Sequence, residues 1–100
     1  MIPINLSRFG FDTSSDKIAI ESLTEIRYFI KLNFEKTENI NPIKSSYGLK
    51  GIIENNLKVH VANGDFVAAM ILEGFKFKQS GKNAYFNISI KSIKRFLPCV

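Results

Sequence analysis

The sequence predicts an α+β fold in which three helices are followed by a β-hairpin and a short C-terminal helix. Between Asp12 and Glu73 the apolar residues recur every three or four positions, which is the period of a helix. From Phe75 onward apolar and polar residues alternate, and a polar segment around Gly81 divides that alternation into two strands. With 100 residues, the chain is expected to form a single domain over residues 1–100.

The first helix is predicted to follow the segment Asp12–Asp16, which is rich in residues that cap helices. If Ser22 and Glu25 form a capping box instead, the helix starts later. Pro42 ends the pattern because proline lacks a backbone donor. The residues before Asp12 are expected to be extended and to pack across the body. One face of this helix carries the apolar residues Ala19, Leu23, Ile26, Ile30 and Phe34.

A second helix is predicted to begin at Ser45 or Ser46. Its apolar face consists of Leu49, Ile52, Ile53 and Leu57, which recur at helical spacing. Gly48 and Gly51 lie on the other face, and their small size suggests that another part of the chain approaches there, although a weak, short helix explains them equally well. Residues 58–62 are expected to be a connection or a short strand.

The third helix is predicted to be capped at Asn63 or Gly64 and to end at Gly74. Asp65 adds a favourable negative charge near its start. The body, Phe66–Leu72, is apolar on every side. Such a helix is either buried on most sides or has one face in contact with a partner.

The hairpin is the clearest local pattern in the chain. Phe75 and Phe77 alternate with lysines, and beyond the polar loop Tyr85 and Asn87 alternate with apolar residues. Ser89 or Ser92 is expected to cap a final helix over residues 93–97, which Pro98 would end. This order of elements is typical of a winged helix-turn-helix domain.

The composition predicts a soluble, cytoplasmic protein without a membrane partner. Hydrophobic residues make up 45% of the chain and charged residues 23%, which is not typical of disorder. No apolar run approaches the ~18 residues of a membrane span, and the first residues lack the pattern of a secretory leader. The single Cys99 cannot form an internal disulfide, which disfavours a small secreted protein.

The positive charge is concentrated near the C-terminus. Residues 1–73 carry eight basic and nine acidic residues, a net charge of −1, whereas residues 74–100 carry six basic and no acidic residues, a net charge of +6. Lysines neutralise phosphates and a tyrosine can stack on a base, so this region predicts contact with the nucleic-acid backbone. The predicted contact residues are Lys76, Lys78, Lys82, Tyr85, Lys91, Lys94 and Arg95, together with Lys50 of the second helix.

The specificity of this contact is expected to be low, because the third helix has no Arg, Lys or Gln with which to distinguish bases. A competing interpretation is a protein-binding surface around Val67 and Ile71, which would form a homodimer or dock on a partner. An acidic host protein is the partner that the positive region would favour.

Catalysis is not expected. The chain has one histidine, His60, and one cysteine, Cys99, too few for a zinc site, and it contains neither a P-loop nor a dinucleotide-binding glycine pattern. We therefore predict no catalytic residues, no metal and no cofactor.

Four segments of the chain resemble small proteins carried by bacterial plasmids, prophages and other mobile elements. They are residues 45–50 (SSYGLK), 63–69 (NGDFVAA), 74–75 (GF) and 83–87 (NAYFN). Gly51 stands where the family is expected to have a histidine, and no catalytic residue carries over. The resemblance implies a DNA-binding accessory protein or an inhibitor of host defence such as an anti-CRISPR protein. The sequence thus favours a non-enzymatic nucleic-acid-binding accessory protein, with such an inhibitor as the alternative.

Overall fold

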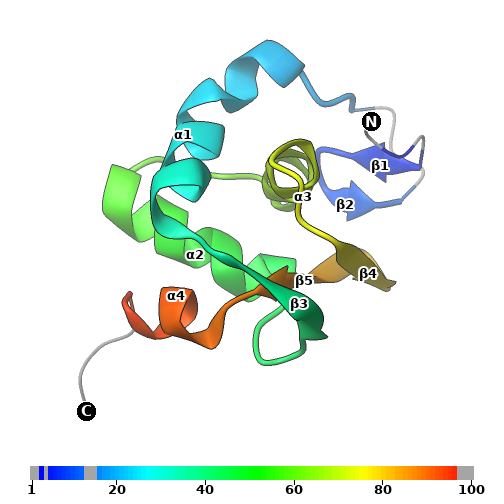
Figure 1. The fold of residues 1–100 in the computed structure, drawn as a ribbon. Helices are drawn as coiled ribbons and strands as arrows, with labels where there is room; N and C mark the ends of the chain where they lie inside the picture. The colour runs from blue at the N-terminus through cyan, green and yellow to red at the C-terminus, as the bar shows by residue number, and fades with distance from the viewer. Residues whose placement is uncertain (1–2, 4, 13–15, 97–100) are drawn as a thin grey trace.

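The computed structural model describes residues 3, 5–12 and 16–96, and Figure 1 shows their arrangement. The elements in chain order are β1 (Leu6–Ser7), β2 (Gly10–Phe11), a short 3-10 helix η1 (Ile20–Leu23), α1 (Thr24–Asn33), β3 (Lys36–Asn41), α2 (Ser46–Leu57), α3 (Asn63–Leu72), β4 (Phe77–Ser80), β5 (Asn83–Ile88) and α4 (Ile90–Lys94). β1 pairs with β2, and the other strands form an antiparallel sheet in the order β3-β5-β4.

The fold is α+β, but the predicted order of three helices followed by a hairpin is wrong. β1 and β2 precede the helices, and β3 lies between α1 and α2, where it pairs with β5. This third strand makes the C-terminal hairpin part of a three-stranded sheet, which the predicted order of elements did not include. Residues 58–62 contain no strand.

The first helix also differs from its prediction. α1 ends at Asn33, well before Pro42, because the chain turns at the buried Phe34 and continues as β3. The predicted capping box is absent: Leu23 occupies the cap position and makes no side-chain cap hydrogen bond.

Helix α3 is the centre of the molecule. Figure 1 shows α3 between α1 and the β1–β2 hairpin, with β5 beneath it, and α3 contacts all of these elements as well as α2. Every residue from Asn63 to Met70 is buried, which confirms the burial expected of an all-apolar helix. The same observation corrects a second prediction: Val67 has no exposed surface and Ile71 is half-buried, so no partner-binding patch is formed there.

The inner face of the sheet packs on this helix. Ala84, Phe86 and Ile88 of β5 are fully buried, as their alternation in the sequence predicts. The rings of Phe66 and Phe86 meet edge to face, with their centroids 6.0 Å apart, and thereby join α3 to the sheet.

No other element of the described chain approaches the glycines of α2 closely, although their spacing suggested such an approach. A Cβ at Gly51 would meet nothing within 4 Å, and at Gly48 it would meet only the side chain of Lys44. The close approach occurs at Gly64 of α3 instead, where a Cβ would overlap the backbone of Ser7. The start of α3 therefore packs directly on β1.

The last helix is capped as predicted by Ser89, whose hydroxyl oxygen accepts a hydrogen bond from the Ser92 N–H at 3.0 Å. It begins at Ile90, three residues earlier than expected. The Ser92 hydroxyl accepts a further bond from the Glu35 N–H at 2.8 Å, which ties α4 to the segment between α1 and β3. The predicted stop at Pro98 lies outside the described residues.

Candidate nucleic-acid interface

Strand β5 separates the predicted basic residues into two groups. Lys76, Lys78 and Lys82 lie on or beside the β4–β5 hairpin, whereas Lys91, Lys94 and Arg95 lie on or directly after α4, beyond the far end of β5 (Figure 1), and Lys50 lies on α2. A strand of this length spans roughly 17–20 Å. Lys82, in the β4–β5 turn, is therefore about one strand length from α4, whereas Lys76 lies opposite Asn87, near the α4 end of β5. The α4 group consists of Lys91, Lys94 and Arg95.

The outer face of the sheet carries a shallow hollow, which we call the sheet groove. It has a volume of about 360 Å³ and is lined by Ile40, Pro42, Lys78, Gln79, Ser80 and Tyr85. Lys78 and Tyr85 are direct cross-strand partners, so their side chains project from the same face of the hairpin. Tyr85 is half-buried, which leaves part of its ring open to the groove.

The charge in the lining of the sheet groove comes from a lysine alone. None of its lining residues is acidic, and Lys76 precedes the same edge strand. Within the described ranges, no carboxylate lies within ion-pair distance of Lys76 or Lys78, and both are exposed. Two lysines thus present unneutralised charge beside an aromatic ring.

Asn87 holds this face rigid and does not contribute to its surface. The alternation predicts an exposed side chain, but Asn87 is buried because its amide bridges the neighbouring strands. Its Oδ1 accepts a hydrogen bond from the Lys76 N–H at 2.7 Å, and its Nδ2 donates to the Thr37 carbonyl at 2.8 Å. The backbone around the groove is therefore fixed before any ligand binds.

The other predicted contact residues are less available. Lys50 is buried, with its Nζ 3.2 Å from Glu54 Oε1, so it is not a phosphate ligand. Lys82 is exposed, but its Nζ lies 3.8 Å from Asp12 Oδ2. Arg95 is 4.0 Å from a carboxylate oxygen of Glu35. Of the α4 group, Lys91 and Lys94 are exposed without an ion pair among the described residues.

A second hollow, which we call the turn groove, lies beside the β4–β5 turn and has a volume of about 390 Å³. The sequence did not point to it, because its residues come from four separate segments that carry no shared motif. It is lined by Phe9, Tyr47, Lys50, His60, Val61, Ala62, Asn63, Lys82 and Asn83.

Glu54 holds one wall of the turn groove in place. Its carboxylate accepts hydrogen bonds from the Val61 N–H at 2.9 Å and from Lys50 Nζ at 3.2 Å, and it lies 3.3 Å from His60 Nδ1. The Val61 N–H is the main reason that the pKa of Glu54 lies below its ordinary value, with Lys50 and His60 acting in the same direction.

Replacing Glu54 with glutamine is expected to lower the free energy of unfolding by about 1 kcal/mol at neutral pH, because the amide is a weaker acceptor than the carboxylate. Since the folded-state pKa is depressed, ionised Glu54 stabilises the fold above its unfolded pKa, and this contribution is lost as the pH falls through the lowered value. Urea unfolding of the wild type and the variant, from neutral pH down to below the lowered pKa of Glu54, measures the difference in their free energies of unfolding. A difference that grew on acidification would contradict the assignment.

The comparison in that experiment must be made against the wild type, because Asp65 titrates with the opposite sign. Burial raises the pKa of Asp65, and Arg8, whose Nε lies 3.5 Å from its Oδ2, only partly opposes this effect. Protonation of Asp65 therefore relieves a desolvation penalty as the pH falls. The contribution of Asp65 is the same in both proteins and cancels.

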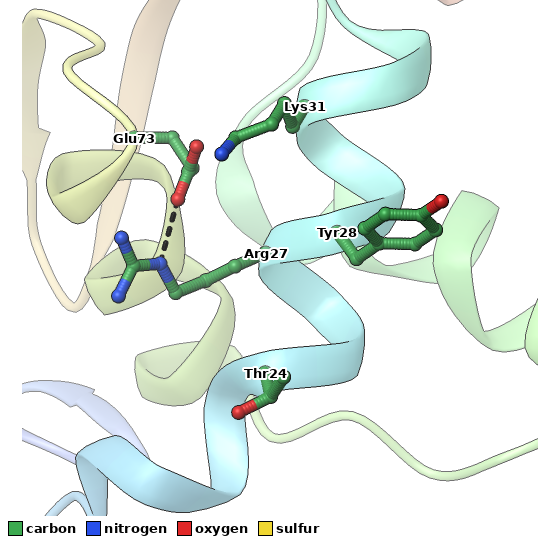
Figure 2. A pocket seen from close by; sticks show the side chains of 5 residues that line it. All are labelled: Thr24, Arg27, Tyr28, Lys31 and Glu73. Carbon is green, nitrogen blue, oxygen red and sulfur yellow. Dashed lines mark hydrogen bonds and ion pairs between the residues drawn. The ribbon is translucent and has the colours of Figure 1, made fainter.

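A third hollow of about 220 Å³ lies between α1 and the end of α3. Figure 2 shows Arg27 and Lys31 directed toward Glu73, while Tyr28 points to the other side of α1. Arg27 Nε lies 2.6 Å from Glu73 Oε2, an ion pair that fastens α1 to α3. Because its carboxylate already engages the arginine, this hollow is a weaker anion site than the sheet groove.

The described part of the chain contains no helix long and apolar enough to cross a bilayer, and no group of three His, Cys, Asp or Glu side chains suited to a metal ion. Comparisons with models of protein families, with curated protein sequences and with solved structures found no match. The resemblance to proteins of mobile elements therefore stays a prediction.

Proposed function

We propose that this protein binds nucleic acid through the sheet groove and that it is a binding protein, not an enzyme. The observation that carries the proposal is the pairing of Lys78 with Tyr85 across the hairpin, in a hollow without acidic residues. A stacking ring next to unneutralised lysines is the arrangement by which proteins hold single strands.

Two kinds of contact hold the nucleic acid in the proposed complex. Lys76 and Lys78 neutralise phosphates, which provides salt-sensitive affinity that does not depend on sequence. Tyr85 stacks on an unpaired base, which favours single strands over duplexes. Besides Tyr85, only Gln79 and Ser80 offer uncharged polar side chains in the groove, and Gln79 Nε2 already donates to the Gly81 carbonyl at 3.2 Å, so selectivity among sequences is weak.

Replacing Tyr85 with alanine is expected to weaken binding of a single-stranded oligonucleotide by about 1–3 kcal/mol, which is the value of one stacked base. Tyr85→Phe keeps the ring and should retain most of the affinity. Fluorescence anisotropy with labelled single-stranded and duplex DNA and RNA measures both effects. If the alanine variant bound as tightly as the wild type, the sheet groove would not be the binding site.

The lysines are tested by the salt dependence of the same binding curve. Neutralising Lys76 and Lys78 together should reduce the slope of log affinity against log salt by about 1.4, or ~0.7 for each phosphate contact to a single strand. The matched control neutralises Lys17, which precedes η1, and Lys31 of α1. Both lysines are exposed, and this double substitution removes the same net charge. An equal effect of both pairs would indicate attraction by net charge alone, and no binding at about 50 mM salt would remove the proposal.

A second candidate function is inhibition of a host protein, as the resemblance to mobile-element proteins implies. β4 is an edge strand of the sheet, and all four of its residues are exposed, so an extended acidic segment of a partner can pair with it. Pull-down with and without nuclease separates the two functions. A stoichiometric protein partner that survives nuclease treatment favours inhibition.

A further inference from the structure

The turn groove brings together two aromatic and two basic side chains that are exposed, each from a different element, and a third basic side chain, Lys50, that is buried. Phe9 lies in the β1–β2 turn, Tyr47 in the first turn of α2, His60 in the connection before α3, and Lys82 in the β4–β5 turn. Their exposed fractions are 52% for Phe9, 65% for Tyr47, 79% for the His60 side chain and 68% for the Lys82 side chain. Two large rings open to water in one hollow are unusual unless they contact a ligand.

The backbone around the groove is preformed. The Lys82 carbonyl accepts a hydrogen bond from the Phe11 N–H at 2.9 Å, which holds the β4–β5 turn against β2. Asn63, which is 8% exposed, donates from Nδ2 to Asn83 Oδ1 at 2.9 Å and so joins the start of α3 to the same turn. The side chain of Lys82 projects from a fixed backbone and is free to exchange its long contact with Asp12 for another anion.

Asn63, which lines the groove, carries an acceptor without a donor. Asn63 Oδ1 is buried and has no hydrogen-bond partner in the described part of the chain. Buried polar atoms are normally paired, and the amino group of a nucleobase is the kind of donor that this oxygen lacks. Because this oxygen is buried, a ligand reaches it only if the Asn63 amide turns and exchanges its hydrogen bond to Asn83 Oδ1 for the new contact.

The charges around the groove nearly balance, in contrast to the sheet groove. Lys50 and His60 both face Glu54, and Lys82 faces Asp12. Such a site attracts a long polyanion less than the sheet groove does, but it accommodates a flat aromatic group that carries a phosphate. Lys82 would exchange its contact with Asp12 for one with the phosphate, and the base would stack on the rings of Phe9 and Tyr47.

We propose that the turn groove binds a nucleoside monophosphate, with the base stacked on Phe9 and Tyr47 and the phosphate held by Lys82 and His60. The same chemistry is present in a free nucleotide and in the phosphorylated end of a strand. Ser80, which lines the sheet groove, and Lys82, which lines the turn groove, are two residues apart, so both hollows adjoin the β4–β5 turn. The site does not depend on the function proposed for the sheet groove.

Isothermal titration of the full chain with AMP, with adenosine and with short single strands carrying or lacking a 5′-phosphate tests the proposal. AMP is expected to saturate and adenosine to bind more weakly. Tyr47→Ala and Phe9→Ala should each weaken AMP at least about 5-fold, the lower limit for loss of one stacking contact. Lys82→Gln should reduce the difference between AMP and adenosine.

Tyr28→Ala is the matched control, because Tyr28 is 64% exposed on α1, outside the groove. Tyr85→Ala should weaken long single strands but leave AMP unchanged, so failure of the sheet groove and failure of the turn groove are distinguishable. Binding of AMP supports a free nucleotide, and binding of only the phosphorylated strand supports a strand end. If neither binds, or if Tyr47→Ala binds both as the wild type does, the turn groove is not a nucleotide site.

Discussion

Replacing Gly64 with alanine is expected to lower the free energy of unfolding by about 3 kcal/mol. A Cβ at this position would overlap the carbonyl oxygen of Ser7 and crowd the backbone of Arg8. The obstruction is backbone, not the end of a flexible side chain, so β1 must move away from α3. That movement would also break the Gly64 N–H to Arg8 carbonyl hydrogen bond of 2.8 Å. Urea unfolding followed by circular dichroism measures the loss.

Gly51→Ala is the control for this variant, because both glycines lie in helices and the alanine methyl group at position 51 would meet nothing within 4 Å. It is expected to stabilise the protein by roughly 0.5–1 kcal/mol through helix propensity. Equal responses at the two positions would show that β1 does not pack on α3. Because Phe9 follows β1, Gly64→Ala should also weaken AMP binding in the turn groove.

Replacing Phe66 with alanine is expected to destabilise the protein by about 3–5 kcal/mol. Phe66 is completely buried and its ring packs edge to face on Phe86, so truncation leaves a cavity between the central helix and the sheet. Both helix and strand are held by their own hydrogen bonds and cannot collapse fully into that space. Thermal and urea unfolding measure the effect.

Phe9→Ala provides the comparison for that variant. Phe9 is 52% exposed and lies outside the core, so its truncation should change stability by no more than about 0.5 kcal/mol. A loss for Phe66→Ala as small as that for Phe9→Ala would contradict the central position of α3. The same unfolding measurement shows whether Phe9→Ala, which also tests AMP binding in the turn groove, keeps its fold.

The elements that the sequence predicted well are those whose evidence is local. The apolar spacing of α2, the continuous apolar body of α3 and the alternation of the β4–β5 hairpin each appear within one segment. Gly74, with a φ of 88°, follows α3 as its position in the sequence suggested. Propensity, capping and periodicity act over a few residues, so they can be recognised without knowing the rest of the fold.

β3 was missed because its own sequence, Lys-Thr-Glu-Asn-Ile-Asn, is almost entirely polar and shows no alternation. It is a strand because β5 supplies hydrogen-bond partners, with a register shift between Lys36 and Asn41. Strands β1 and β2 are two residues each, too short to show any period. Pairing between distant segments determines all three.

The residues of the candidate sites follow the same rule: local patterns predicted some of their positions, and contacts between distant segments decided the others. The alternation alone placed Lys78 and Tyr85 on one face of the hairpin. It placed Asn87 on the surface too, but cross-strand hydrogen bonds buried it. Lys50 carries a charge in the sequence, yet Glu54 and burial remove it from any phosphate surface.

Local sequence alone was enough to predict α2, α3 and the β4–β5 hairpin, the apolar character of α3 and the concentration of positive charge after Glu73. The tertiary structure decided which of those charges remain unneutralised, where β3 completes the sheet, and that the residues of the turn groove meet at all. The physical reason is that local conformation depends on neighbours in the chain, whereas burial, ion pairing and cavities depend on residues brought together from far apart.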